Sequence, residues 1–245
     1  MRHWLIPLLV AFTLPATAQK IRVAVAANAQ FVMEKLKADF EKKTGLSVES
    51  IFNSSGKLTA QIQNGAPFDV FLSADLHYPE LVFRAGLAQA KPKTYAYGLL
   101  VLWTRADIDP TQGLAVLADK RITKIAIANP KTAPYGSVAV NTLTQQNLLR
   151  GLQSKIVYGE SIAQVNQYLV SGAVDAGFTA KSVVLEPLLR GKGRWADVKG
   201  AKPIAQGVVL LKKAAVGSQK FYDYLFSPEA RAIFKQYGYQ LPSRP

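Results

Sequence analysis

The sequence predicts an α/β protein of two lobes, and three observations support this class. Short apolar runs, typical of buried strands, alternate with amphipathic stretches at helical spacing. The alternation occurs in two successive series. A long apolar run, Thr94–Thr104, separates the two series, and another, Gly207–Leu211, follows the second. Such alternation favours a parallel, doubly wound sheet in each lobe, with ligands at the carboxyl ends of the strands.

The first strand and helix are the clearest pair. Ile21–Ala26 is expected to be a buried strand, followed at once by a helix that ends at Gly45. One apolar stripe runs along this helix, formed by Ala29, Val32, Met33, Leu36 and Phe40. Asn28 takes the predicted N-cap position. Because a helix start at a strand's carboxyl end presents free N–H groups and a positive dipole, this junction suits an anion.

The other elements are expected in the same alternating order. In the first series we expect strands at Leu46–Phe52 and Asp69–Ser73, and helices from Ser54 to Ile62 and from near Pro79 to Ala85. In the second series we expect strands at Lys124–Ala128, Lys155–Tyr158 and Ala176–Thr179, and helices at Ser137–Leu149, Ser161–Val170 and Ala180–Leu189. An exposed loop is expected at Gly191–Gly200, then helices at Ser218–Leu225 and from Ser227 to Gly238.

The long runs Thr94–Thr104 and Gly207–Leu211 are candidate crossovers between the lobes. The first is longer than a strand of a single sheet needs. The predicted division is therefore a signal peptide at 1–18, a discontinuous first lobe at 19–95 and 205–245, and a second lobe at 96–204.

The first 18 residues have the pattern of a cleavable secretory signal peptide. A basic start precedes the apolar run Trp4–Leu14, and Ala16-Thr17-Ala18 supplies a small-x-small cleavage site. An uncleaved membrane anchor is the alternative, although a span needs about 20 apolar residues. We therefore expect an exported, soluble protein, periplasmic in a Gram-negative organism. The chain has no cysteine, so it forms no disulfide and carries no lipid-attached thiol.

Charge and motif content favour a binding protein for a small anion. The formal net charge is +14, which suits either nucleic acid or an anionic solute. Lysine and arginine are spread along helices rather than clustered, and export also argues against nucleic acid. After residue 18 the only histidine is His77, in a position typical of a surface or capping residue. No nucleophile, phosphate-loop, zinc or calcium motif is present, so catalysis has little support and no cofactor is expected.

Four predicted strand-to-helix junctions carry small neutral donors. They are Asn28, Ser54-Ser55-Gly56, Pro134-Tyr135-Gly136-Ser137 and Glu160-Ser161-Ile162. Each alone is an ordinary helix cap, because Ser and Asn are common there. Their recurrence at equivalent places in both series is informative, since closing the lobes would bring the helix starts together.

These segments resemble the periplasmic molybdate-binding proteins, the solute-capturing subunits of molybdate ABC transporters. The most specific match is Asn64–Asp75, which is similar to the family run G-A-P-x-D-[VL]-F-[IL]-S-A-D. Further matches are spread along essentially the whole chain after residue 18: Val23–Asn28, Phe52–Leu58, Pro134-Tyr135-Gly136, Phe221–Leu225 and Ile233–Gly238.

The resemblance implies a two-lobed periplasmic-binding-protein fold (type II), each lobe a βα sandwich, closing on molybdate or tungstate in the inter-lobe cleft. By position, the oxyanion contacts would be Asn28, Ser55, Tyr135 and Ile162, the last through its backbone. The implied partner is the membrane permease of an ABC transporter, and a monomer is the default state. A carboxylate would repel an oxyanion, so Asp69 and Asp75 are expected to be structural.

The chain departs from the family at two of these positions. Some members have Ser where Asn28 stands, so the first contact here would be an amide donor. Some also have an oxyanion-contacting Tyr where this chain has Ala180. We hypothesise that the Tyr135 hydroxyl replaces that tyrosine. Two alternatives remain open: the same fold binding sulfate, chromate or phosphate, and an exported enzyme that uses the cleft.

Overall fold

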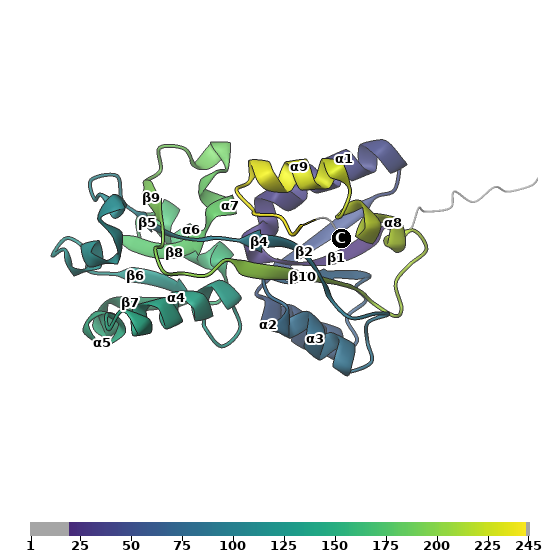
Figure 1. Cartoon of the computed structure of the whole chain (residues 1–245), viewed down its shortest axis with the longest axis horizontal. Helices are drawn as coiled ribbons and strands as arrows, with labels where there is room; N and C mark the ends of the chain where they lie inside the picture. Colours follow the sequence, from purple (N-terminus) through teal and green to yellow (C-terminus); the bar gives the residue numbers. More distant parts are fainter. Residues whose placement is uncertain (1–19, 244–245) are drawn as a thin grey trace, which may run out of the picture.

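The computed structural model describes residues 20–243 and consists of two α/β lobes side by side, each built on a five-stranded sheet (Figure 1). The first sheet has the order β2-β1-β3-β10-β4 and contains β1 (Ile21–Ala26), β2 (Val48–Asn53), β3 (Val70–Leu72), β4 (Lys93–Gly98) and β10 (Ile204–Leu210). The second has the order β7-β6-β8-β5-β9 and contains β5 (Leu100–Thr104), β6 (Ile125–Ala128), β7 (Ile156–Gly159), β8 (Ala176–Ala180) and β9 (Arg194–Asp197). The predicted signal peptide lies outside the described residues.

Helices cover both faces of each sheet. The first lobe has α1 (Gln30–Thr44), α2 (Ser55–Gln63), α3 (His77–Arg84), α8 (Ser218–Tyr224) and α9 (Pro228–Gln236). The second has α4 (Pro134–Gln145), α5 (Leu149–Leu152), α6 (Ile162–Val170) and α7 (Lys181–Val184). Short 3-10 turns lie at Ala27–Ala29, Pro110–Ala118, Gln153–Lys155 and Pro187–Leu189. Within residues 20–243, no helix is long and apolar enough to cross a membrane.

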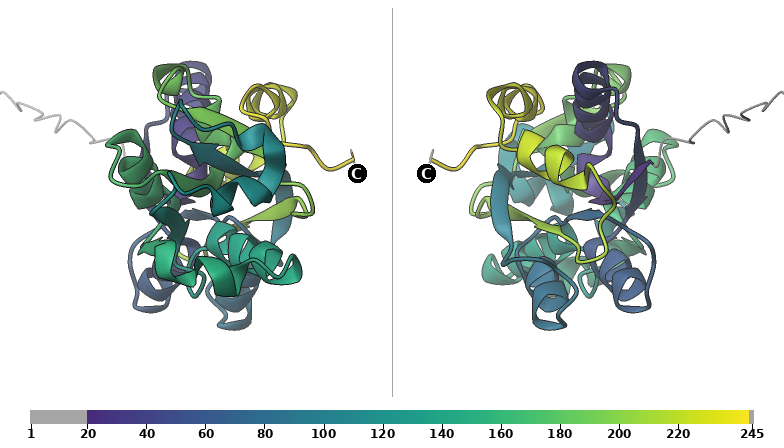
Figure 2. Two further views of the ribbon diagram at one scale, coloured as in Figure 1. Left: turned by 90° about the vertical axis from the view of Figure 1, so that its left-hand side faces the viewer. Right: turned by 90° about the vertical axis from the view of Figure 1, so that its right-hand side faces the viewer.

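The two faces of strand β1 pack into two different hydrophobic cores. Val23 and Val25 point to the face covered by α1, α8 and α9, whereas Ala24 points to the face covered by α2 and α3. On the first face Phe40 of α1 packs edge-on against Phe221 of α8, with ring centroids 5.1 Å apart. Figure 2 shows these helices above and below the sheets. The predicted two-lobed α/β class is thereby confirmed.

The sheets are mixed rather than parallel, which corrects one expectation. The strands β2, β1 and β3 are parallel, as are β7, β6 and β8. Strand β10 pairs antiparallel with both β3 and β4, and strand β5 pairs antiparallel with both β8 and β9. The reason is that β5 and β10 are the strands on which the chain arrives from the other lobe, so each starts at the end of its sheet where the neighbouring strands finish, whereas β4 and β9 run in the same direction as the parallel strands.

The predicted crossover Thr94–Thr104 is not one strand. Backbone pairing stops at Leu99, so β4 belongs to the first sheet and β5 to the second. The chain returns between Asp197 and Ile204, and β10 then lies in the first sheet. The lobe boundaries at 95/96 and 204/205 stay predictions.

Four local expectations also need correction. The turn Ala27–Ala29 is 3-10, α1 begins at Gln30, and Asn28 makes no capping hydrogen bond. Helix α4 begins at Pro134 rather than Ser137, because proline fits the first helical position. The expected helix to Leu189 ends at Val184, shortly before Pro187. The expected loop Gly191–Gly200 contains β9.

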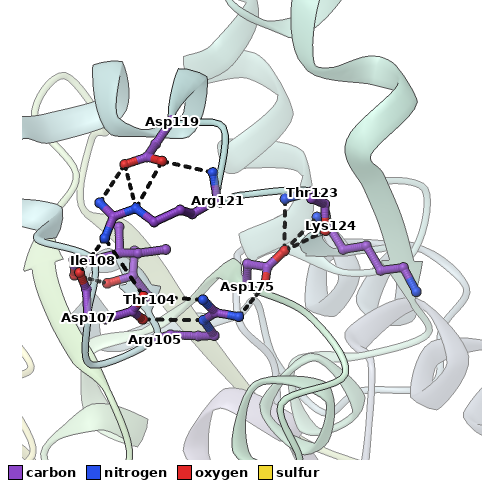
Figure 3. A network of polar contacts seen from close by, with 9 residues as sticks. All are labelled: Thr104, Arg105, Asp107, Ile108, Asp119, Arg121, Thr123, Lys124 and Asp175. Carbon is purple, nitrogen blue, oxygen red and sulfur yellow. Dashed lines mark hydrogen bonds and ion pairs between the residues drawn. The ribbon is translucent and has the colours of Figure 1, made fainter.

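Asp175 links several segments at the end of the second sheet where β6 and β8 begin (Figure 3). Its carboxylate accepts hydrogen bonds from the backbone N–H groups of Thr123 and Lys124, at 2.8 and 3.0 Å, and pairs with Arg105 at 3.1 Å. Burial alone would raise the pKa of Asp175, but these donors outweigh it and hold the pKa below its usual value. This network fixes the strand starts, so the opposite strand ends are held in register.

Gly136 lets the first turn of α4 approach the end of β6, and its replacement tests that close contact. A Cβ there would lie 1.9 Å from the Ala128 carbonyl oxygen. We expect Gly136→Ala to lower the free energy of unfolding by roughly 1–3 kcal/mol in urea denaturation, because backbone atoms must move. Gly151→Ala is the matched control, since no atom lies within 4 Å of its Cβ position. Equal stability of the two variants would contradict the packing argument.

Candidate functional site

A small cavity lies between the two lobes, where strand ends of both sheets meet. Its free volume is only about 10 Å³, about the room that one water molecule needs, so a larger solute enters only when the lobes move apart. Ten residues line it: Ala26, Ala27, Asn28, Ser54, Ser55, Ala74, Ala133, Pro134, Tyr135 and Ile162. Among these described residues there is no Asp, Glu, Lys, Arg or His.

All four residues predicted for the site, Asn28, Ser55, Tyr135 and Ile162, line this one cavity. They follow β1, β2, β6 and β7, so each lobe contributes two strand-to-helix junctions. The structure adds Ser54, whose buried Oγ has no hydrogen-bond partner within the described chain. The adjacent serines Ser54 and Ser55 indicated this position in the sequence, but a serine before a helix is ordinarily the N-cap of that helix.

Ser55 is arranged to donate its hydroxyl hydrogen into the cavity. Its side chain is fully buried, and its Oγ accepts a hydrogen bond from the backbone N–H of Ala74 at 3.0 Å. A hydroxyl has one hydrogen to donate. Because the Ala74 contact uses a lone pair, that hydrogen remains available for an acceptor in the cavity.

Two lobe-2 helices begin at the cavity. Ile162 is the first residue of α6, with Ser161 as N-cap accepting from the Gln164 N–H, and Tyr135 is the second residue of α4. Backbone N–H groups in a first helical turn have no partner within the helix. The nine-residue α6 and twelve-residue α4 thus direct donors and positive dipole ends at the space beside Ser55.

The Asn28 side chain is engaged behind the cavity wall rather than capping α1. Its Nδ2 donates to Gln206 Oε1 at 2.9 Å and to the Tyr239 hydroxyl at 3.1 Å. A carboxamide nitrogen carries two hydrogens, so both are used. The expected amide donor is therefore occupied by the protein, and the backbone of the Ala27–Ala29 turn is what remains to contact a solute.

The Tyr135 hydroxyl also lies behind the wall, against the crossover strand. A Cβ added to Gly98 would be 1.9 Å from this oxygen, so a side chain at 98 would displace it. Burial raises the pKa of Tyr135 well above 10, although the neighbouring Asn28 side chain acts in the opposite direction. Ala180, the position at which some family members have an oxyanion-contacting tyrosine, is fully buried at the end of β8.

The ionisable residues Asp69, Asp75 and His77 do not line the cavity. The Asp69 carboxylate accepts the backbone N–H groups of Arg22 and Ala215, each at 2.6 Å. Asp75 accepts the backbone N–H of Tyr78 at 3.2 Å, and burial raises the pKa of Asp75. His77 is exposed at the start of α3. Within residues 20–243 no group of His, Cys, Asp and Glu could hold a metal ion.

The mouth of the cavity is closed by three contacts between the lobes. Thr132 accepts the backbone N–H of Gly56 at 2.9 Å, and the Lys131 carbonyl accepts the Tyr78 hydroxyl at 3.0 Å. Lys57 of α2 pairs with Glu160, which follows β7. This pair is exposed on both sides, so it contributes little to stability.

A larger groove of about 650 Å³ lies at the opposite edge of the first sheet. Its walls include apolar Ile62, Phe68, Leu87 and Leu211, with basic Lys212 at its rim. It lies at strand starts and turns, so no helix begins there. The inter-lobe cavity is smaller, but it is where helix starts and hydroxyls converge.

Comparison with known proteins agrees with this geometry. The family model for bacterial extracellular solute-binding proteins matches residues 21–240. The chain is 42% identical to the molybdate-binding protein ModA of Azotobacter vinelandii, over 92% of each chain. It is 37% identical to ModA of Rhodobacter capsulatus, over 95% of this chain and 92% of the relative.

Solved structures show the same similarity. The periplasmic molybdate-binding protein of Azotobacter vinelandii matches with a TM-score of 0.86 at 37% identity, over 91% of this chain and 100% of that one. Sequence and fold therefore agree over nearly the whole length, and the chain belongs to the bacterial extracellular solute-binding proteins and, among them, to the family of periplasmic molybdate-binding proteins.

Proposed function

We propose that the protein captures molybdate, and also tungstate, outside the cytoplasm and delivers it to the membrane permease of an ABC transporter. The observation that carries this proposal is the convergence of four strand-to-helix junctions on one cavity without a charged side chain. The relatives are named for binding molybdate, and the proposal extends that property to this chain.

The donors suit a fully ionised oxyanion. The Ser55 hydroxyl and the backbone N–H groups of Tyr135, Ile162 and the Ala27–Ala29 turn supply hydrogens. Helix N-termini stabilise negative charge without a formal counter-charge. The only titratable side chain in the lining is Tyr135, which stays neutral at physiological pH because burial raises its pKa. A group that transfers protons at neutral pH is thus missing from this lining, which favours binding over catalysis.

Discrimination among tetrahedral anions follows from size in this proposal. Molybdate, tungstate and sulfate share charge and shape, so identical donors would attract all three. The walls are made by backbone and by Ala26, Ala27, Ala74 and Ala133, whose short side chains cannot change rotamer to resize the space. Such a cavity sets donor positions rigidly, and an anion with shorter bonds would leave some donors out of reach.

Location and assembly follow from the same proposal. In this proposal residues 1–18 direct export and are removed, and their signal-peptide pattern supports a periplasmic location. Both lobes of one chain complete the cavity, so a monomer suffices for capture. No second copy is needed to supply a donor.

Anion titration tests the proposed ligand directly. Molybdate and tungstate, each at about 100 times the dissociation constant, should add roughly 2.7 kcal/mol to the free energy of unfolding, because they bind only the folded protein. Sulfate, chromate and phosphate at the same concentrations should give no comparable thermal shift. Equal stabilisation by sulfate would favour the alternative oxyanion. No shift with any oxyanion would favour the exported enzyme.

Two single substitutions separate side-chain donors from backbone donors. Ser55→Ala should weaken molybdate binding in calorimetry by about 10- to 150-fold, the equivalent of a charge-assisted hydrogen bond of roughly 1.5–3 kcal/mol. Tyr135→Phe should change affinity less than about threefold, because the contact is assigned to the backbone and the hydroxyl already lacks a partner in the described chain.

Ser218→Ala is the control for these variants, since Ser218 is a fully buried hydroxyl of the first lobe outside the cavity. Its affinity should equal that of the wild type. A loss in Tyr135→Phe as large as in Ser55→Ala would instead support the hypothesis that the tyrosine hydroxyl binds the anion.

Breaking the Lys57–Glu160 ion pair at the mouth should speed the release of molybdate. Lys57→Gln removes the pairing with Glu160, and we expect the molybdate off-rate to rise by up to about fivefold, as for a loss of up to ~1 kcal/mol. Stopped-flow fluorescence measures the rate. Arg84→Gln breaks a comparable exposed pair inside α3 and should leave the off-rate unchanged. Identical behaviour of the two variants would mean that the mouth pair plays no part in closure.

A further inference from the structure

A buried hydrogen-bond network surrounds Asn28, and its starting point is Gln206 on the returning crossover strand β10. Gln206 is fully buried. Its Nε2 donates to the carbonyl oxygens of Ala74, at 3.0 Å, and Ile204, at 2.8 Å. Both carbonyls require a donor, so the amide of Gln206 has one possible orientation. Its Oε1 must therefore face Asn28.

That orientation fixes Asn28 in turn. Because Gln206 presents an acceptor, Asn28 must present its Nδ2, which lies 2.9 Å away. The second hydrogen on this nitrogen is directed at the Tyr239 hydroxyl at 3.1 Å. The remaining atom, Asn28 Oδ1, is buried and has no hydrogen-bond partner within the described chain.

Tyr239 joins this network from the far end of the sequence. It follows α9, its ring packs edge-on against Phe234 at 5.5 Å, and only 4% of it is exposed. Its hydroxyl is also 3.3 Å from Ser182 Oγ and 3.4 Å from the Asn28 carbonyl oxygen. Ser182, in α7 of the other lobe, donates to that same carbonyl at 2.7 Å. Both the side chain and the backbone of Asn28 are thus held.

We infer that Tyr239 is a positioning residue for the oxyanion site, acting through Asn28. The inference rests on the proposed function and deepens it. Together with Gln206 and Ser182, Tyr239 prevents the Asn28 carboxamide from rotating and keeps the Ala27–Ala29 backbone facing the cavity. Free rotation would bring the acceptor Oδ1 toward an anion, and an acceptor repels it.

The network also joins three parts of the molecule at one residue. Tyr239 belongs to the carboxyl-terminal segment, Gln206 to a strand that connects the lobes, and Ser182 to the second lobe. Any movement of the lobes must stretch the Ser182 contact, which ends on the Asn28 carbonyl. The donor loop of the first lobe is therefore set correctly only when the second lobe is in place.

A double-mutant cycle tests this assignment. Tyr239→Phe removes the hydroxyl that accepts from Asn28, and it should weaken molybdate binding in calorimetry by about tenfold. In an Asn28→Ala background the same change should have almost no effect, since the group being positioned is gone. A purely structural role would give additive losses, because lowered stability does not depend on the Asn28 side chain.

Tyr95→Phe is the matched control. Tyr95 also packs on Phe234, at 5.2 Å, and also has a buried hydroxyl, but that hydroxyl makes no bond to Asn28. It should bind molybdate like the wild type. Ser182→Ala provides a second variant if Tyr239→Phe folds poorly: it should also weaken molybdate binding, and because its partner is the backbone carbonyl of residue 28, that loss should persist in the Asn28→Ala background.

The outcomes separate the two proposals. Wild-type protein without affinity for molybdate would overturn the proposed function and this inference with it. Wild-type binding that both Tyr239→Phe and Ser182→Ala leave unchanged, or losses that add in the Tyr239→Phe/Asn28→Ala double variant, would overturn the inference alone.

Discussion

If the protein binds molybdate as proposed, holding a doubly charged anion without a counter-charge is the constraint on which this architecture depends. The donors must then be backbone N–H groups and hydroxyls, and backbone donors are free in number only where helices begin. Parallel strands followed by helices place such starts along one edge of a sheet. Two such edges, one in each lobe, face each other across the cavity.

Bringing backbones this close requires small residues at the junctions. Ala26, Ala27 and Ala74 form part of the wall, and Gly136 allows α4 to start against the end of β6. At the mouth, a Cβ on Gly56 would lie 3.0 Å from the Thr132 Cα, so the lobes meet there backbone to backbone. The alanines and glycines are thus the means by which dipoles and N–H groups come within reach of one small solute.

The sequence could predict much of the fold, because the spacing of apolar residues along strands and helices reflects which side chains are buried. It could not locate the break at Leu99, since Thr94–Thr104 is apolar on both sides of it and each half is buried in a different sheet. It missed β9, whose residues are exposed or half-buried at a sheet edge and therefore carry no apolar pattern.

The candidate site shows a different limit. Residue type and position could predict that Asn28 and Tyr135 line the cavity, but not which of their atoms faces it. For Asn28 that choice depends on Gln206 and Tyr239, which are 178 and 211 residues away in the chain. No local pattern could reveal those partners.

Dividing the donors between two lobes also determines how strong the other inter-lobe contacts can be. An open form presents only one lobe's donors, so the anion itself must supply most of the free energy of closure. If Lys57–Glu160 and its neighbours were strong, the empty protein would stay closed and solute could not enter. If they were absent, the closed form would be rarer and the apparent affinity lower by that fraction. At the mouth, an exposed ion pair and two backbone-carbonyl contacts lie between these limits, and the buried hydrogen bond from Ser182 to the Asn28 carbonyl adds to them, which fits the proposed role of retaining and releasing a ligand.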